Sequence, residues 1–209
     1  MKSFDFKDKK VLIRVDFNVP QDENLAVTDN TRIMAAAPTI KKVLAEGGIP
    51  VLMSHLGRPG GERVPKMSLS ALVDEVEKAV GATVHFAEDC IGDVAAAAVA
   101  KAKAGEAVLL ENLRYYKEET TGDKGFAEAL AALGDIYLND AFGTAHRAHA
   151  STAIVAQFFS TENKGFGDLM NAEVESISKA LGSDRDSTVA IIGGAKVSSK
   201  IGVITNMID

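Results

Sequence analysis

Four arginines and a histidine are spaced along the chain in positions that suit the binding of an anion. Arg58, Arg114 and Arg147 lie in turn-like segments near glycine, asparagine or histidine, Arg32 opens a helical pattern, and His55 precedes Arg58 by three residues. A guanidinium group offers a planar fork of donors that matches phosphate or carboxylate oxygens. If they converge, these side chains would form a site for a small anion with more than one charged group.

Two further polar residues, Asp16 and Asn18, follow the first apolar run. Their oxygens do not suit an anion, but they suit a hydroxyl group. A ligand with phosphate, carboxylate and hydroxyl groups would therefore satisfy the whole set. Simpler interpretations exist, since Asp16 or Asn18 could cap a turn and a single arginine could form a surface ion pair. The placement of so many polar residues just beyond apolar runs favours a shared site.

The segment Asn139–Thr152, NDAFGTAHRAHAST, places polar side chains among residues too small to form a core. Small residues let a backbone and a ligand approach closely, so this segment suits one wall of a binding site. His146 and His149, with Cys90 as a third ligand, could suggest a metal. Their spacing matches no standard zinc cluster and Arg147 between them would repel a cation, so no metal site is predicted.

A second candidate for phosphate binding is GGAKVSSK, at Gly193–Lys200. It follows an apolar run and opens a helical pattern, and the N–H groups at a helix N-terminus attract phosphate. Lys196 and Lys200 are four residues apart and would share a helix face. The segment matches neither the P-loop nor the dinucleotide-binding pattern, and an ordinary turn with two solvated lysines is the alternative.

The elements that must position these residues are short apolar runs separated by helical patterns. Strands are predicted at Val11–Val15, Pro50–Met53, Thr83–Phe86, Ala107–Leu110, Ile136–Leu138 and Thr188–Ile192. Helices are predicted at Thr31–Glu46, with Pro38 inside it, and at Ser68–Val80, Asp93–Ala104 and Lys124–Leu133. This alternation predicts an α/β fold, a Rossmann-like parallel sheet with helices on both faces. Ligands of such sheets bind beyond the carboxyl ends of the strands, where the polar residues fall.

The pattern changes after residue 157. Phe158–Asp168 is rich in polar residues and glycine and is predicted to be a linker, and an amphipathic helix is predicted at Leu169–Leu181. A strand and a helix, Lys196–Ile208, then start what is expected to be an incomplete second domain, because one strand and one helix cannot bury their own faces. Arg14 and His85 lie within predicted strands and are expected to be structural, Arg14 in an ion pair.

Composition narrows the class of protein further. The 209 residues are 46% hydrophobic with a net charge of −6, which argues against nonspecific nucleic-acid binding. No apolar run reaches the roughly 18 residues that a membrane span needs, and no signal peptide is recognised in MKSFDFKDKK. The single cysteine, Cys90, favours a reducing compartment. A soluble cytoplasmic protein that binds neither nucleic acid nor a membrane is therefore expected.

The motifs together resemble the phosphoglycerate kinase family. The resemblance rests on RVDFNVP, SHLGRP, LLENLRYY, NDAFGTAHRAHAS and GGAKVSSK, which occur in the order of that family and extend over essentially the whole chain. It implies a two-domain glycolytic enzyme that transfers a phosphoryl group between 1,3-bisphosphoglycerate and ADP, giving 3-phosphoglycerate and ATP. It also implies ATP/ADP with Mg²⁺ as cofactors, and a monomer.

The resemblance also implies roles for individual residues. Asp16 and Asn18 would hold the hydroxyl end of the substrate. A basic patch around its carboxylate and phosphate would consist of Arg32, His55, Arg58, Arg114 and Arg147, with His146 and His149 in support. Arg32 and Lys196 would stabilise the transferring group, and Lys200 would hold the nucleotide phosphates.

Family members are about twice as long as this sequence, as the resemblance implies. The chain is therefore expected to comprise a phosphoglycerate-binding N-terminal domain (1–168), an interdomain helix (169–182) and the start of a nucleotide-binding domain (183–209). The main Mg²⁺ ligands are expected in a missing C-terminal part, and this chain is expected to be inactive alone. Two alternatives remain open: a non-catalytic module that binds phosphoglycerate, and a nucleotide-binding domain that uses GGAKVSSK alone.

Overall fold

A computed structural model of the chain describes residues 4–182, 191, 201, 202 and 205. The chain divides into two compact units, Met1–Val174 and Glu175–Asp209, with the boundary inside a helix. The first unit contains the sheet and all of the candidate residues except Lys196 and Lys200. The sequence-based domain limits at residues 168 and 182 remain a prediction.

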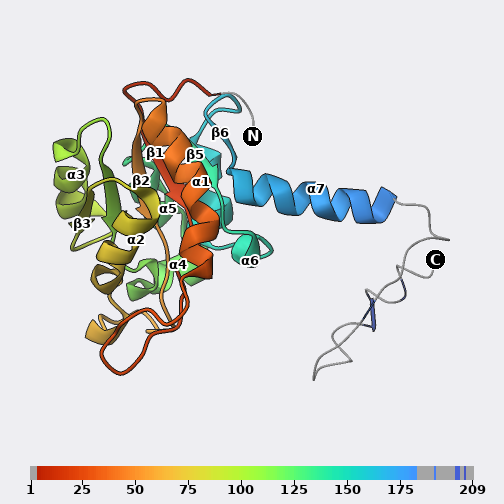
Figure 1. Cartoon of the computed structure of the whole chain (residues 1–209), viewed down its shortest axis with the longest axis horizontal. Helices are drawn as coiled ribbons and strands as arrows, with labels where there is room; N and C mark the ends of the chain where they lie inside the picture. Colours follow the sequence, from red (N-terminus) through yellow and green to blue (C-terminus); the bar gives the residue numbers. More distant parts are fainter. Residues whose placement is uncertain (1–3, 183–190, 192–200, 203–204, 206–209) are drawn as a thin grey trace. The chain divides into compact units, whose positions relative to one another are not determined.

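The first unit is built on one six-stranded sheet in which every pairing is parallel. The strands lie in the order β3-β4-β2-β1-β5-β6, and Figure 1 shows the central ones behind helix α1. Their bounds are β1 Lys10–Arg14, β2 Ile49–Met53, β3 Val84–Ala87, β4 Ala107–Leu110, β5 Ile136–Asn139 and β6 Lys164–Phe166. The strand order reverses between β1 and β5, where a doubly wound sheet opens a crevice at its carboxyl edge.

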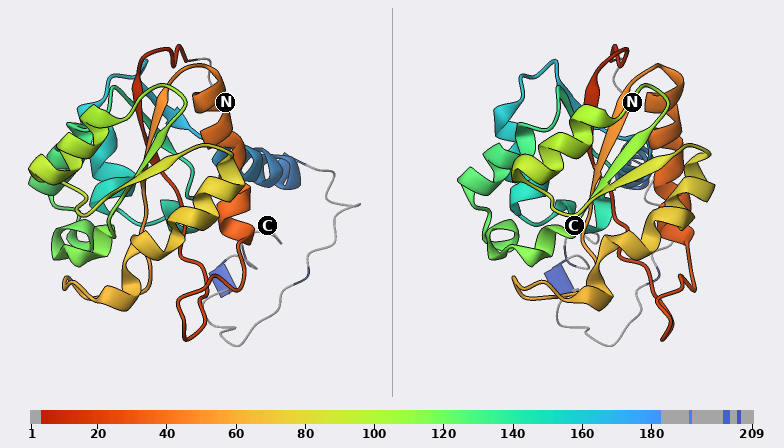
Figure 2. Two further views of the ribbon diagram at one scale, coloured as in Figure 1. Left: turned by 60° about the vertical axis from the view of Figure 1, so that its left-hand side comes forward. Right: turned by 90° about the vertical axis from the view of Figure 1, so that its left-hand side faces the viewer.

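Helices cover both faces of the sheet, as the alternating pattern predicted. Helices α1 (Thr31–Ala45) and α2 (Val73–Val80) lie on one face, and α3 (Gly92–Lys101) and α5 (Lys124–Ala131) lie on the other. Figure 2 shows α1 and α2, in orange and yellow, opposite the green α3 and α5. The prediction of an α/β fold with a parallel sheet is therefore confirmed.

The pleat of β1 explains how one strand serves two cores. Successive side chains point to opposite faces, so Ile13 packs with α1 and α2 while Leu12 packs with α3 and α5. Arg14 is two residues beyond Leu12 and therefore points toward the same face as Leu12. The fully buried Arg14 side chain thus enters the layer beneath the carboxyl edge.

Short elements complete the first unit. Two of them, α4 (Lys117–Thr121) and α6 (Phe142–Ala145), follow β4 and β5 respectively. A π-helical turn, η4 (Ala150–Ile154), continues into the 3-10 turn η5 (Val155–Phe158). Three other 3-10 turns are η1 (Pro65–Met67), η2 (Leu69–Leu72) and η3 (Leu113–Tyr115).

The structure corrects three expectations about secondary structure. The supposed linker Phe158–Asp168 contains β6, which pairs with β5 and forms the edge strand on that side of the sheet. Three residues that include a glycine give too weak a strand signal to be recognised alone. The helix expected at Ser68–Val80 is divided into η2 and α2, with the Ser68 hydroxyl capping η2. Helix α3 ends at Lys101 rather than Ala104.

The last described helix is α7, Asp168–Gly182, close to the predicted Leu169–Leu181. Of the predicted strand Thr188–Ile192 only Ile191 is described, and it lies outside regular structure. Of the predicted helix Lys196–Ile208, the described residues are Ile201, Gly202 and Thr205, and these are helical. No helix among the described residues is both long and apolar enough to span a membrane.

Candidate anion-binding site

A cleft of about 240 Å³ opens where the loops after β1, β2, β4 and β5 meet. This position matches the carboxyl-edge crevice expected of the strand order. All seven residues predicted to bind substrate line it: Asp16, Asn18, Arg32, His55, Arg58, Arg114 and Arg147. Gly57, Gly143 and Thr144 complete the lining. The structure therefore brings together side chains that are spread over more than half of the sequence.

One end of the cleft is organised by Asp16. Its Oδ2 lies 3.0 Å from Nη1 of Arg32, and its Oδ1 accepts a 3.3 Å hydrogen bond from the backbone N–H of Asn18. The Arg32 side chain is half exposed while that of Asp16 is largely covered. Four arginines thus face one carboxylate in the cleft, which leaves an excess of positive charge for a ligand.

Gly57 connects the two ends of the cleft through its backbone. Its N–H donates to Oδ1 of Asn18 at 2.8 Å, and its carbonyl accepts from Nη1 of Arg114 at 3.0 Å. The residue has φ of +64°, and an added Cβ would lie 2.9 Å from Sδ of Met67. A residue with a side chain would be strained at this φ and would also displace the Met67 side chain, so glycine is favoured here.

Arg114 is the most deeply placed guanidinium of the cleft. Burial lowers its pKa, and the neighbouring cations Arg14 and Arg147 lower it further. Its Nε is buried without a hydrogen-bond partner among the described residues. A bound anion would supply the opposite charge that this side chain lacks.

His55 is buried and does not carry a positive charge at neutral pH. Burial lowers its pKa to about 2, helped by the cations Arg14, Arg114 and Arg32. The ring can therefore contribute a hydrogen bond to the cleft but not a charge.

Arg14 is structural, as expected, but the predicted ion pair is wrong. Its Nε donates to Oγ of Ser151 at 2.8 Å, Nη1 donates to the carbonyl of Val15, and Nη2 lies 3.2 Å from Nδ1 of His55. The nearest acid acts through Ser151, whose hydroxyl donates to Oε1 of Glu119 at 2.6 Å. At the end of β1 the Arg14 side chain is sealed from solvent, and the Glu119 carboxylate reaches it only through the Ser151 hydroxyl.

A second hollow of about 500 Å³ adjoins the cleft. It shares Arg58, Arg114 and Arg147 with the cleft and adds Gly60, Gly61, Tyr116, Lys117, Thr120 and His149. His149, one of the two predicted supporting histidines, is buried, and burial lowers its pKa although Glu119 opposes this. His146 lines neither hollow, and its Nε2 accepts from Nε of Arg147 at 3.3 Å.

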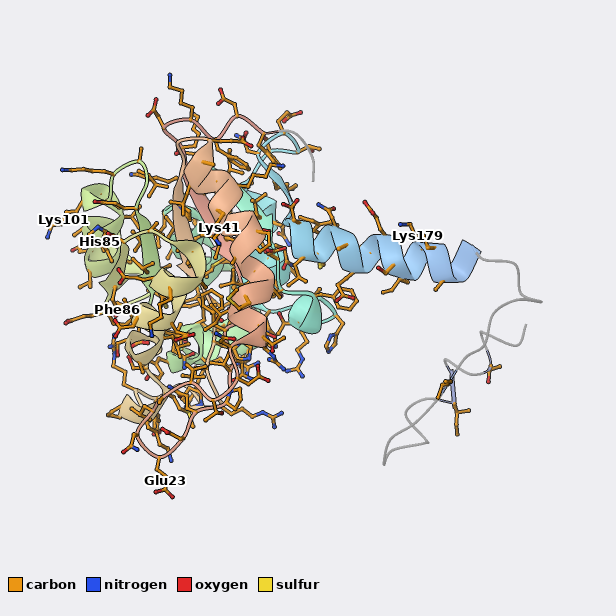
Figure 3. The ribbon with its side chains drawn as sticks, viewed as in Figure 1. Glu23, Lys41, His85, Phe86, Lys101 and Lys179 are labelled. Carbon is orange, nitrogen blue, oxygen red and sulfur yellow. The ribbon has the colours of Figure 1, made fainter. Side chains whose placement is uncertain are left out.

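The remaining candidates lie elsewhere. Lys196 and Lys200 fall outside the described residues. Cys90 is buried in the core, where burial raises the pKa of its thiol. Figure 3 shows His85 with Phe86 and Lys101 at the β3 edge of the sheet, and the ring of His85 pairs with Glu106 at 3.0 Å. This contact accords with the structural role expected of His85, which stays a prediction.

Some residues of the site were not identified from the sequence. Gly143 and Thr144 belong to the conspicuous segment Asn139–Thr152 but were not assigned to a site. Glu119 was missed because KEETT has the composition of an exposed helix, whereas its side chain is fully buried. Ser151 carried a usable signal, since it is a small polar residue at the end of that same segment.

A doubly wound α/β unit with an arginine-lined cleft at its carboxyl edge has an architecture that suits the binding of small, multiply charged anions. Comparison with known proteins narrows this class. The family model "Phosphoglycerate kinase" matches residues 1–209, so the chain belongs to the phosphoglycerate kinase family.

Individual relatives agree with the family assignment. The chain is 50% identical to phosphoglycerate kinase of Moorella thermoacetica and 44% identical to that of Porphyromonas gingivalis, and each match covers 100% of this chain. The solved structure of phosphoglycerate kinase from Coxiella burnetii superposes with a TM-score of 0.86 at 35% identity over 99% of this chain. These matches cover 52%, 55% and 51% of the relatives, so the chain spans about half the length of the proteins it matches.

Proposed function

We propose that this chain supplies the phosphoglycerate half-site for phosphoryl transfer between 1,3-bisphosphoglycerate and ADP, which gives 3-phosphoglycerate and ATP. The observation that carries the proposal is the convergence of seven polar side chains in one cleft of about 240 Å³, in a member of this family. Four guanidinium groups against one carboxylate suit a three-carbon acid that bears both a phosphate and a carboxylate.

The arrangement of the cleft suggests how the ligand lies. Arg58, Arg114 and Arg147 form the wall shared with the adjoining hollow, and they would hold one charged end of the ligand. Arg32 stands beside Asp16 and would hold the other end. Asp16 and Asn18 would then orient the hydroxyl group between the two ends, because the Asp16 carboxylate can accept a hydrogen bond from the hydroxyl and the Asn18 amide can donate one to it.

Phosphoryl transfer needs in-line positioning and positive charge around the transferred group more than it needs covalent chemistry. We assign the stabilisation of the transition-state charge to Arg32 and Lys196, and the nucleotide phosphates to Lys200. No general base is required, because the acceptor carboxylate of 3-phosphoglycerate is already ionised. When bound, Mg²⁺ and the nucleotide would supply the phosphoryl donor and neutralise its charge, and both proposed lysines lie outside the described residues.

The wider setting is also part of the proposal. A cytoplasmic location accords with the single buried cysteine, and a lack of nucleic-acid partners accords with the net charge of −6. The monomeric state is proposed only because the family resemblance implies it.

The half-site can be tested by calorimetry on the 209-residue chain with 3-phosphoglycerate. The Arg58→Ala variant should bind at least about tenfold more weakly, because a charged hydrogen bond is worth about 1.5–3 kcal/mol. Arg63→Ala is the matched control, since Arg63 is an exposed arginine that pairs with Asp89 outside the cleft. Equal affinities for both variants, or no binding to the unaltered chain, would reject the half-site.

The catalytic role of Arg32 needs a full-length member of the family. A contact made only in the transition state should lower kcat at saturating substrate when the corresponding arginine becomes alanine. An unchanged kcat with a raised KM would assign this arginine to binding alone. A full-length protein that binds phosphoglycerate but shows no phosphoryl transfer with any nucleotide would favour the alternative of a binding module.

A further inference from the structure

Beneath the cleft, four polar side chains form a continuous buried row. They come from four elements: Glu119 from α4, Ser151 from η4, Arg14 from β1, and His55 from the loop after β2. The first three are fully buried and His55 is 4% exposed. Of the four, only His55 lines the cleft. The row therefore links a buried carboxylate to a ring that faces the proposed ligand.

The carboxylate end of the row fixes the orientation of Ser151. Oε2 of Glu119 accepts from the backbone N–H of Ser151 at 3.0 Å, and Oε1 accepts from its hydroxyl at 2.6 Å. Since its one hydroxyl proton is used, the Ser151 oxygen must act as an acceptor toward any other neighbour. That neighbour is Nε of Arg14, 2.8 Å away.

The hydrogen bond from Arg14 fixes which nitrogen of the His55 ring carries the proton. A guanidinium group has donors only, so Nη2 of Arg14 must donate to Nδ1 of His55 across 3.2 Å. Nδ1 must then carry a lone pair, which leaves the proton of the neutral ring on Nε2. Among the described residues no hydrogen bond is found at this Nε2, and it is not one of the fully covered polar atoms that lack a partner. Since His55 lines the cleft, Nε2 is open to it.

We propose that Glu119, Ser151 and Arg14 are positioning residues that hold His55 in the Nε2–H tautomer, so that the ring presents a neutral hydrogen-bond donor to an anionic ligand in the cleft. The arrangement of the row stands on its own geometry, while the ligand it serves rests on the function proposed above.

The charges around the ring agree with a neutral donor. Burial lowers the pKa of His55 to about 2, and the groups that face it are Arg14 from β1, Arg114 from the loop after β4, Arg32 from α1, and His149. Three permanent cations disfavour a fourth, so the ring stays neutral from pH 5 to 8. A cationic His55 would repel Arg14, and its protonated Nδ1 could no longer accept the hydrogen bond from Nη2 of Arg14.

The tautomer can be measured directly by ¹⁵N NMR of the histidine side chains in the ligand-free 209-residue chain. His55 should show a protonated Nε2 and an unprotonated Nδ1, unchanged between pH 5 and 8. A proton on Nδ1, or an imidazolium at pH 6, would overturn the proposal without any variant. The other three histidines can be assigned by substituting each one in turn.

The row itself can be tested with Ser151→Ala, which removes the hydroxyl that links Glu119 to Arg14. The His55 signals should change toward a mixture of tautomers, and the affinity for 3-phosphoglycerate should fall by up to about tenfold. Ser151→Thr keeps the hydroxyl and should retain the single tautomer. If Ser151→Ala left the His55 spectrum unchanged, the row would not position the ring.

The chain offers a matched control in a second serine–glutamate pair. The hydroxyl of Ser68 donates to Oε2 of Glu111 at 2.7 Å, in a cluster that does not contact Arg14 or His55. Ser68→Ala should leave the His55 tautomer and the affinity unchanged. If 3-phosphoglycerate bound neither to the unaltered chain nor to any variant, the proposed function would fail, while the ligand-free NMR spectra would still decide the tautomer.

Discussion

Two layers of charged side chains lie at the carboxyl edge of the sheet, and they differ in whether the protein itself supplies their partners. In the upper layer, Arg58, Arg114 and Arg147 line the open cleft and form no ion pair with any carboxylate in the described part of the chain. In the lower layer, Arg14 is fully buried, each of its nitrogens has a partner, and Glu119 balances it through Ser151. The lower layer is satisfied by the protein itself, and the upper layer is left for a ligand.

The difference follows from the cost of burying a charge. A buried guanidinium without partners would destabilise the fold strongly, so Arg14 can persist only because each of its nitrogens has a partner. A guanidinium at the surface is solvated, so several can lie together at moderate cost. The intermediate case is Arg114, which is buried and leaves its Nε unpartnered. The two layers should therefore respond differently to substitution and to added anion.

The largest effect is expected in the lower layer. Glu119→Ala should lower the free energy of unfolding by about 3–5 kcal/mol, because it leaves Arg14 as an unbalanced buried charge. The neighbouring Glu118 is exposed, so Glu118→Ala should change stability by no more than about 0.5 kcal/mol. Urea denaturation of both variants measures the contrast. A loss below about 1 kcal/mol for Glu119→Ala would show that the lower layer does not need its carboxylate.

The upper layer should affect stability only through a ligand. With 3-phosphoglycerate at 100 times its Kd, the unaltered chain should gain about 2.7 kcal/mol, since the ligand binds the folded state alone. Arg147→Ala should unfold within about 0.5 kcal/mol of the unaltered chain when ligand is absent. At the same ligand concentration it should gain about 1.4 kcal/mol less if its affinity falls tenfold.

Thermal unfolding with and without the ligand checks this second expectation. Lys41→Ala is the control, because Lys41 is an exposed cation on α1 that does not line the cleft. Equal ligand-induced stabilisation in Arg147→Ala and in the unaltered chain would mean that the upper layer does not hold the anion.

A third effect concerns the pH dependence of stability at Asp140, a buried carboxylate with fewer hydrogen-bond partners than Glu119. Oδ1 of Asp140 accepts from the backbone N–H of Met170 at 3.1 Å, while Oδ2 is buried without a hydrogen bond among the described residues. Burial raises the pKa of Asp140. The folded state therefore favours the protonated acid, and stability falls as the pH rises from the unfolded-state value of about 4 through the raised folded-state value.

Asp140→Asn removes that titration while keeping an oxygen for Met170. The stability of the variant relative to the unaltered chain should therefore improve as the pH rises through this window. Urea denaturation at a series of pH values measures the difference. A pH dependence that is identical in the two proteins would show that Asp140 is not a source of instability at neutral pH.

The sequence was sufficient for the parts of the molecule that repeat simple patterns. Apolar runs in the sequence predicted β1 to β5. The rule that ligands bind at the carboxyl edge predicted that Arg58 and Arg114 would share one cleft. It was not sufficient where partners are distant in sequence. Glu119 is 32 positions from Ser151, and Ser151 is 137 positions from Arg14, so no local pattern links them. Strand β6 likewise depends on its pairing with β5 more than on its own residues.

The smallest effect on stability should come from the ion pair between Asp16 and Arg32, which lies in the open cleft but is made within the protein. Asp16 and Arg32 pair at 3.0 Å, but Arg32 is half exposed, so the pair resembles a surface salt bridge more than the buried row. Asp16→Asn should cost about 0–1 kcal/mol of stability, and added salt should shrink this difference because it screens exposed charges. Chemical denaturation at low and at high salt would measure it. A salt-independent loss as large as that of Glu119→Ala would place Asp16 in the lower layer. The cleft would then be a rigid extension of the core, and Arg32 would not be free to exchange Asp16 for a ligand.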